Sequence, residues 1–174
     1  EPLPCQGGLI GYISYDAVRY MERLPELARD DLQLPFMYFW LLDDVVIYDH
    51  QKQQLHLIVH AGDSEESDAI RRLDAYERMW FEEQNESPCW LPAASAAAPS
   101  VSMTRPQFIE AVRRVQQYIA QGDVFQVNLS VRQSQPLLSH PFAVYKQLRA
   151  INPSPYMAYL QAPDCQVVSG SPEL

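Results

Sequence analysis

Two sets of polar side chains have the types and spacing to do chemistry. The first occupies alternate positions, Gln126, Asn128, Ser130 and Arg132. Alternate residues of a strand face the same side, so these four would form one polar face that either lines a polar cavity or meets water. The second is Glu173 in the segment SGSPEL. A partly buried glutamate can keep its proton near neutral pH and act as a general acid, although a glutamate after proline is more often solvated.

Hydrophobic periodicity predicts the elements that position these residues. A strand is predicted over 125–132, because apolar side chains alternate there with the polar series: Phe125, Val127, Leu129 and Val131. Before it, Thr104 and Gln107 have the spacing of a capping box, and Gly122 ends a run of apolar residues at helical steps. A helix from Thr104 to Gly122 therefore leads into the strand.

Further elements are expected after the polar series. A second helix would start at Ser139 and Pro141 and end at the Asn152-Pro153 pair, because the residue before a proline disfavours the helical conformation. The segments SPYMAYL and CQVVSG then predict two strands joined by a turn over 162–164.

The first half of the chain has strand patterns followed by one helix pattern. A strand is predicted over 10–15 and a helical stretch after it, with apolar residues at three-residue steps: Val18, Met21 and Leu24. Residues 35–61 indicate antiparallel strands with a turn over 49–54. Residues 64–83 predict an amphipathic helix with this apolar face: Ile70, Leu73, Tyr76 and Met79. The glycines of GGLIG suit a tight turn and close backbone packing rather than phosphate binding.

The element order predicts the fold class and the domain organisation. Helices stand apart from antiparallel sheets, which is typical of an α+β protein with helices on the outside. Residues 1–86 would form an N-terminal α+β portion, and residues 87–103, rich in Pro, Ala and Ser, a linker. Residues 104–174 would begin a second domain. Because the chain opens with Glu1 and stops soon after a strand, we expect a fragment of a longer protein.

Composition excludes several classes of function. The net charge is -9 and Lys and Arg form no cluster, which argues against nucleic acid as a partner. No apolar run reaches the roughly 18 residues that span a membrane. Three cysteines without CxxC spacing suggest neither a disulfide scaffold nor a zinc site, and His56 and His60 lie on an expected strand rather than in a metal site. We expect a soluble cytoplasmic protein.

Four blocks occur in the order of a known family: QGGLIGYISYDAVRYME, GDVFQVNLSVRQ, NPSPYMAYL and SGSPEL. Together they resemble the chorismate-utilising enzymes, which include the large subunits of anthranilate synthase and of aminodeoxychorismate synthase, also called para-aminobenzoate synthase. The combination is most similar to the aminodeoxychorismate synthase branch, component I, and the resemblance runs from Gly7 to the last residue. It implies an anthranilate synthase-like fold, here incomplete.

The resemblance also implies an activity. The synthase would aminate chorismate at C2 with loss of the C4 hydroxyl, toward 4-amino-4-deoxychorismate in folate biosynthesis. In relatives that add water to chorismate, a lysine at the position of Gln126 activates the water. A primary amide has no usable basicity, so ammonia from a glutamine amidotransferase subunit is the expected nucleophile, and Gln126 would face the substrate cavity. Glu173 matches the glutamate that protonates the departing hydroxyl.

Other implications concern ligands and alternatives. The segment Asn152, Pro153, Ser154, Pro155, Tyr156 and Met157 matches the tryptophan-binding segment of feedback-inhibited anthranilate synthases. The Mg²⁺ ligands are expected beyond residue 174, so no metal site is predicted within the chain, and the isolated fragment should be inactive and marginally stable. Two alternatives remain open: anthranilate synthase component I, in tryptophan biosynthesis, and a non-catalytic module that binds an amino-acid effector.

Overall fold

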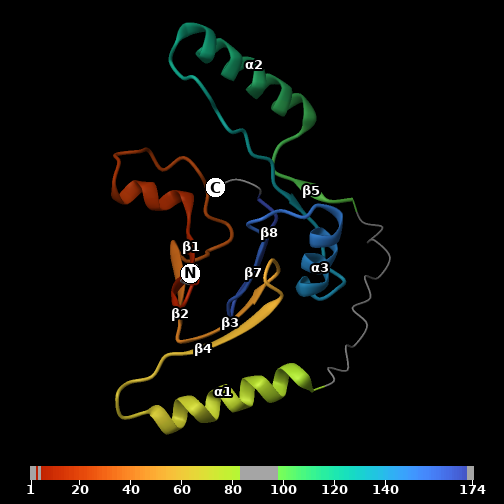
Figure 1. Ribbon diagram of the computed structural model, residues 1–174. Coiled ribbons are helices and arrows are strands. Elements are labelled where there is room, and N and C mark those ends of the chain that lie inside the picture. Colours follow the sequence, from red (N-terminus) through yellow and green to blue (C-terminus); the bar gives the residue numbers. More distant parts are fainter. Residues whose placement is uncertain (1–2, 4, 83–97, 172–174) are drawn as a thin grey trace. The chain divides into compact units, whose positions relative to one another are not determined.

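The structure, a computed structural model, describes residues 3, 5–82 and 98–171 (Figure 1). The chain divides into two compact units, Glu1–Asn85 and Glu86–Leu174. Every strand pair in the described residues is antiparallel, and helices follow the strands, which confirms the predicted α+β class. The boundaries at residues 87 and 103 stay predictions, because residues 87–97 lie outside the described residues. None of the described helices is long and apolar enough to cross a membrane.

The first unit opens with a two-stranded ribbon. Strand β1 (Gly8–Ile13) pairs with β2 (Met37–Leu42), from Gly8 opposite Leu42 to Ile13 opposite Met37. The 3-10 helix η1 (Tyr15–Tyr20) follows β1. The predicted helical stretch extended to Leu24, but the helix ends at Tyr20. Arg19 donates hydrogen bonds to the carbonyls of Leu24 (3.4 Å) and Pro25 (2.8 Å), so the chain beyond Tyr20 folds back toward η1.

Glycines allow the two strands of this ribbon to meet. A Cβ atom on Gly11 would lie 1.9 Å from the carbonyl oxygen of Tyr38 and 2.8 Å from Cα of Phe39, so no side chain fits there. Gly7 and Gly8, at the entry to β1, have φ of +150° and +112°, which side chains other than glycine rarely adopt. The predicted turn and close backbone packing are therefore confirmed.

A second ribbon completes the sheet structure of this unit. Strand β3 (Asp44–Asp49) pairs with β4 (Gln54–Val59), as the predicted turn over 49–54 requires. The Asp49 carboxylate accepts the backbone N–H groups of Lys52 (3.0 Å) and Gln51 (2.9 Å). These bonds, the one from Lys52 first, hold the pKa of Asp49 below its ordinary value, because they stabilise the charged form.

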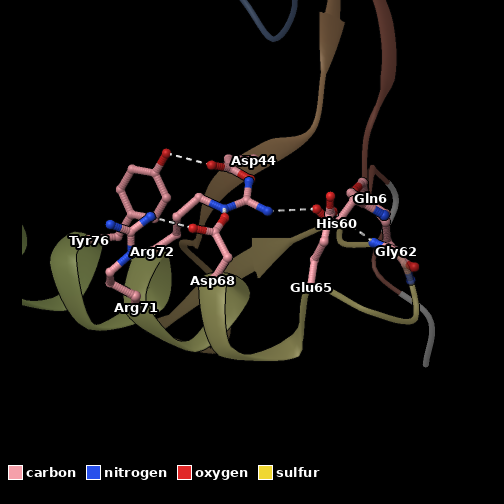
Figure 2. Close-up of polar contacts among 9 residues, drawn as sticks. All are labelled: Gln6, Asp44, His60, Gly62, Glu65, Asp68, Arg71, Arg72 and Tyr76. Atoms are coloured by element: carbon pink, nitrogen blue, oxygen red, sulfur yellow. Dashed lines mark hydrogen bonds and ion pairs between the residues drawn. The ribbon is translucent and has the colours of Figure 1, made fainter.

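Helix α1 (Glu66–Phe81) is joined to the second ribbon by polar contacts, shown in Figure 2. Arg72 reaches the Asp44 carboxylate on β3 (2.5 Å) and the carbonyl of His60 just after β4 (2.9 Å). The Tyr76 hydroxyl donates to the other oxygen of Asp44 (2.7 Å), and Asp68 pairs with Arg72 (3.0 Å). We call these four side chains, Asp44, Asp68, Arg72 and Tyr76, the Asp44 clamp.

The clamp residues of α1 lie on the half-buried side of the helix. The predicted apolar face contained Ile70 and Met79, yet their exposed fractions are 52% and 57%. The half-buried residues of the helix include Asp68 and Arg72, together with Leu73 and Tyr76. The predicted amphipathic helix is therefore present, and two of its four apolar positions, Leu73 and Tyr76, lie on the half-buried side with Arg72.

The second unit begins with a short strand pair and a well-capped helix. Strand β5 (Ser100–Val101), inside the expected linker, pairs with β6 (Gln133–Ser134). Helix α2 (Arg105–Gln121) has the predicted capping box, in which the Gln107 side-chain oxygen accepts the Thr104 N–H (2.9 Å). It ends at Gly122, whose φ of +83° is the left-handed conformation of a helix C-cap.

The strand predicted over 125–132 is not formed. Only residues 133–134 of this region pair with another strand, and Phe125, expected on a core, is 93% exposed. Alternation shows that two faces differ, but a strand also needs a hydrogen-bonded neighbour. Within the described residues, the chain offers none to residues 125–131.

The second unit continues with a helix and a hairpin, as predicted. Helix α3 (Pro141–Ile151) is followed by β7 (Ala158–Gln161) and β8 (Gln166–Ser169), which pair from Ala158 opposite Ser169. Three rings join helix to hairpin: Phe142 lies 5.2 Å and Tyr145 6.0 Å from Tyr159, between ring centroids. Ala143, on the same helix, is buried. Aromatic packing therefore holds α3 on this hairpin.

We expect Gly11→Ala to destabilise the first unit. The added methyl group would collide with backbone atoms of β2, which cannot move as a side chain does, so the free energy of unfolding should fall by about 3 kcal/mol. Gly62→Ala is the matched control, because its Cβ would meet only the Glu65 carboxylate, at 3.7 Å. Urea unfolding measures both variants. Equal stability of the two would contradict the close approach of β1 and β2.

We expect Tyr76 to lose its proton above the ordinary tyrosine pKa of 10.0. Its pKa is raised because the hydroxyl donates to the Asp44 carboxylate, so ionisation would place two negative charges together. The stability from this bond is therefore present at neutral pH and lost as the pH rises through the raised pKa. The measurement is the ultraviolet difference titration between wild type and Tyr76→Phe.

Two further variants test the cause of the Tyr76 shift. Asp44→Asn should return the titration of Tyr76 toward 10.0, because the neighbouring charge is removed. Tyr48→Phe is the matched control, since the Tyr48 hydroxyl donates to a neutral acceptor, the side-chain oxygen of Gln53 (2.8 Å). A Tyr76 that titrates at or below 10.0 in the wild type would show that the bond to Asp44 does not form in solution.

Candidate functional site

The Asp44 clamp gathers several charged groups, but its geometry indicates a structural role. Asp44 faces Arg72, and Asp68 faces both Arg71 and Arg72. The hydrogen bond from Arg71, helped by both guanidinium charges, lowers the pKa of Asp68. Burial lowers the pKa of Arg72, but Asp44 outweighs it and leaves that pKa raised. Groups held in their charged forms by each other are poorly suited to exchange protons with a substrate.

An open hollow of about 450 Å³ lies on the first unit. The Nε2 atom of His60 lies 2.5 Å from the carbonyl oxygen of Gln6 (Figure 2). The hollow has one acidic and one imidazole side chain, and these residues line it: Gln6, Gly7, Gly8, Leu41, Leu42, Asp43 and His60. Neither this region nor any other part of the described chain holds three His, Cys, Asp or Glu side chains that could bind a metal ion together.

Gln126 lies in a segment that is anchored at its two ends. The segment leaves α2 at Gly122 and is fixed at Arg132, whose carbonyl accepts the N–H of Ser102 (2.9 Å). The Arg132 N–H in turn donates to the Ser102 hydroxyl (2.9 Å). Gln126 itself is exposed, as are Asn128 and Ser130. Within the described residues, no hydrogen bond joins its side chain to the other candidate residues.

The segment Asn152–Met157 connects α3 to β7. Asn152 is the C-cap of α3, and its N–H donates to the carbonyl of Leu148 (2.8 Å). Pro155 and Tyr156 form a turn, and Tyr156 is 52% exposed. Ser154 and Met157 are half-buried. The segment is therefore anchored by the helix on one side and by the strand on the other.

Ser154 connects this segment to the chain that leads to Glu173. Its hydroxyl donates to the carbonyl oxygen of Ser171 (2.7 Å). Glu173 lies outside the described residues, two positions after Ser171. Sequence reasoning treated the two motifs separately and missed this contact. The hairpin supplied the signal, since antiparallel pairing brings the residues before β7 close to those after β8.

Known proteins are similar to this chain in sequence. The family model described as chorismate binding enzyme matches residues 1–174. Aminodeoxychorismate synthase component 1 of Bacillus subtilis (strain 168) is 48% identical over 177 residues, which cover 97% of this chain and 36% of that protein. Anthranilate synthase component 1 of Thermus thermophilus is 46% identical over 176 residues, with 98% and 36% covered. The chain thus spans about a third of the length of these curated relatives.

A solved structure confirms the fold. The crystal structure of anthranilate synthase component I from Streptococcus pneumoniae TIGR4 superposes with a TM-score of 0.82 at 28% sequence identity. The match covers 99% of this chain and 40% of that one. The predicted anthranilate synthase-like fold is therefore confirmed for the part of that protein that the chain matches.

Proposed function

The chain belongs to the chorismate binding enzyme family, and we propose that it is part of a synthase subunit that aminates chorismate. The ammonia would come from a glutamine amidotransferase partner. The observation that carries this proposal is the amide at Gln126, in the block where relatives that add water have a lysine. Cytoplasmic location is part of the same proposal.

The nucleophile follows from the chemistry of Gln126. Water is a poor nucleophile until a base removes its proton, and a primary amide cannot serve as that base near neutral pH. Ammonia carries its own lone pair and needs no such base. An amide can still donate to or accept from a bound substrate, so we propose that Gln126 faces the substrate cavity in the whole protein.

Glu173 would supply the proton that the departing hydroxyl needs. Ammonia adds at C2 of chorismate while the C4 hydroxyl departs, and hydroxide is a poor leaving group. Protonation by the Glu173 carboxyl group lets it leave as water, which is general acid catalysis. The resulting carboxylate is then available to take up a proton released from the added ammonia.

Two products can follow from this step. Loss of pyruvate from the intermediate aminated at C2 gives anthranilate. Formation of 4-amino-4-deoxychorismate requires a second displacement, in which another ammonia attacks C4 and the amino group at C2 leaves as ammonia. Identities of 48% and 46% to the two kinds of synthase are too close to separate them. We propose the 4-amino product, for folate biosynthesis, on the similarity of the blocks FQVNLSVRQSQPL and NPSPYMAYL to that branch.

Mg²⁺ is part of the proposed activity, but the described residues do not fit it. Mg²⁺ prefers carboxylate oxygens and water, and the two carboxylates of the Asp44 clamp, Asp44 and Asp68, already pair with arginine. We propose, as the resemblance to the family implies, that the Mg²⁺ ligands lie beyond residue 174. The ion would help to hold a dianionic substrate.

An effector role for Asn152–Met157 remains a second proposal. The sequence NPSPYM is the observation that favours it, because the segment resembles the tryptophan-binding segment of feedback-inhibited anthranilate synthases. The half-buried Met157 and the exposed ring of Tyr156 supply apolar surface there. A protein that only binds an amino acid at this segment would be a non-catalytic module.

The whole protein should convert chorismate with ammonium and Mg²⁺ to 4-amino-4-deoxychorismate. We expect para-aminobenzoate only when aminodeoxychorismate lyase is added, measured by chromatography with fluorescence detection. Anthranilate without the lyase would instead establish the tryptophan branch and favour tryptophan as the effector. Absence of both products would refute amination and leave the effector-binding module. Residues 1–174 alone should give no turnover.

Glu173→Gln should lower kcat of the whole protein by about 100-fold, because the amide cannot protonate the leaving hydroxyl. KM for chorismate should change little, since the substitution keeps the shape of the side chain. Glu110→Gln on α2 is the matched control, because Glu110 is exposed and pairs with Arg113, at 3.9 Å, away from the segment that leads to Glu173. Initial rates of chorismate consumption measure both. Turnover of Glu173→Gln near wild type would exclude Glu173 as the acid.

A further inference from the structure

We propose that Ser154 is a positioning residue for Glu173. Its hydroxyl holds the backbone of Ser171, two residues before the glutamate. The inference rests on the proposed function, because it presumes that the Glu173 carboxyl group is the general acid. It goes further by giving one residue of the Asn152–Met157 segment a part in the reaction.

The donor of this hydrogen bond, Ser154, lies on a segment that is itself held in place. Ser154 is half-buried, and its Oγ atom lies 2.7 Å from the Ser171 carbonyl oxygen, a normal length for a hydroxyl donor. Two residues earlier the chain is fixed by the bond between the Asn152 N–H and the Leu148 carbonyl. The donor is therefore carried by the end of α3, which is itself packed on the hairpin through Phe142 and Tyr145.

The acceptor lies where the strand no longer supports the chain. The pairing of β7 with β8 ends at Ser169. At Gly170 the backbone passes close to α3, since a Cβ there would lie 3.1 Å from Leu148 Cδ2. The next residue is Ser171, which Ser154 holds through its carbonyl. Contacts with α3 and with the segment after it thus replace the strand ladder as support for the chain.

A fixed backbone at Ser171 matters for a general acid. A proton donor must come within hydrogen-bond distance of the leaving oxygen, about 3 Å. Two residues of chain span at most about 7 Å, so a restraint at Ser171 limits where Glu173 can lie. Misplacement by about 1 Å costs up to about 100-fold in rate, so loss of the restraint should lower kcat rather than weaken substrate binding.

The test uses the whole protein and variants at Ser154. We expect Ser154→Ala to lower kcat about 10-fold with KM changed less than about twofold. Ser154→Thr keeps a hydroxyl group and should restore most of the rate. Ser100→Ala is the matched control: the Ser100 hydroxyl also donates to a serine carbonyl, that of Ser134 (3.4 Å), but between β5 and β6. It should leave kcat unchanged.

A double variant separates positioning from a general loss of stability. If Ser154 acts through the glutamate, Ser154→Ala should have almost no further effect on kcat in the Glu173→Gln background. Thermal midpoints are measured for every variant. If Ser154→Ala does not fold, Ser154→Cys takes its place, because a thiol has a similar shape and is only a weak donor.

The outcomes are distinct. A low kcat for Ser154→Ala, rescue by threonine and non-additivity with Glu173→Gln support the inference. Wild-type kcat for Ser154→Ala, or equal fold-losses in both backgrounds, would overturn it while the proposed function stands. Full activity of Glu173→Gln would remove the proposed acid, and the role of Ser154 with it.

Discussion

Each strand that the structure describes is paired with a single neighbour, and the other features of the fold depend on this constraint. A two-stranded ribbon is marginally stable in water unless something packs on it. The ribbon β3–β4 is joined to α1 by Asp44 and Arg72, and the ribbon β7–β8 is packed against α3 by aromatic rings. The ribbon β1–β2 depends on the close approach at Gly11.

The sequence predicted best what a short stretch of chain determines by itself. The capping box at Thr104, the left-handed Gly122 and the stop at Asn152-Pro153 need no distant partner, and all were confirmed. The strand over 125–132 failed because pairing depends on a distant strand that alternation cannot reveal. The contact between α1 and β3 could not be predicted for a similar reason, since the partner of Arg72 lies 28 residues earlier.

The same distinction between local and distant determinants applies to the candidate site. Motifs singled out Gln126, Glu173 and the Asn152–Met157 segment as chemistry-bearing residues, and their roles stay predictions. The contact between Ser154 and Ser171 was missed, because it depends on the register of β7 and β8 and on the path of the chain after each strand. Composition and spacing carry no signal for such a contact, whereas a predicted hairpin register would have placed these two regions side by side.

The proposed chemistry needs one proton-transfer group in this part of the protein, the acid at Glu173. Ammonia requires no base, so a neutral amide at Gln126 suffices where water would demand a lysine. The leaving hydroxyl does require an acid, and an acid acts only over hydrogen-bond distance. Under the proposed chemistry, position 126 therefore needs no base, whereas position 173 needs both a carboxyl group and the right position in space. A hydroxyl group that holds the backbone just before the acid would help to keep that acid in position.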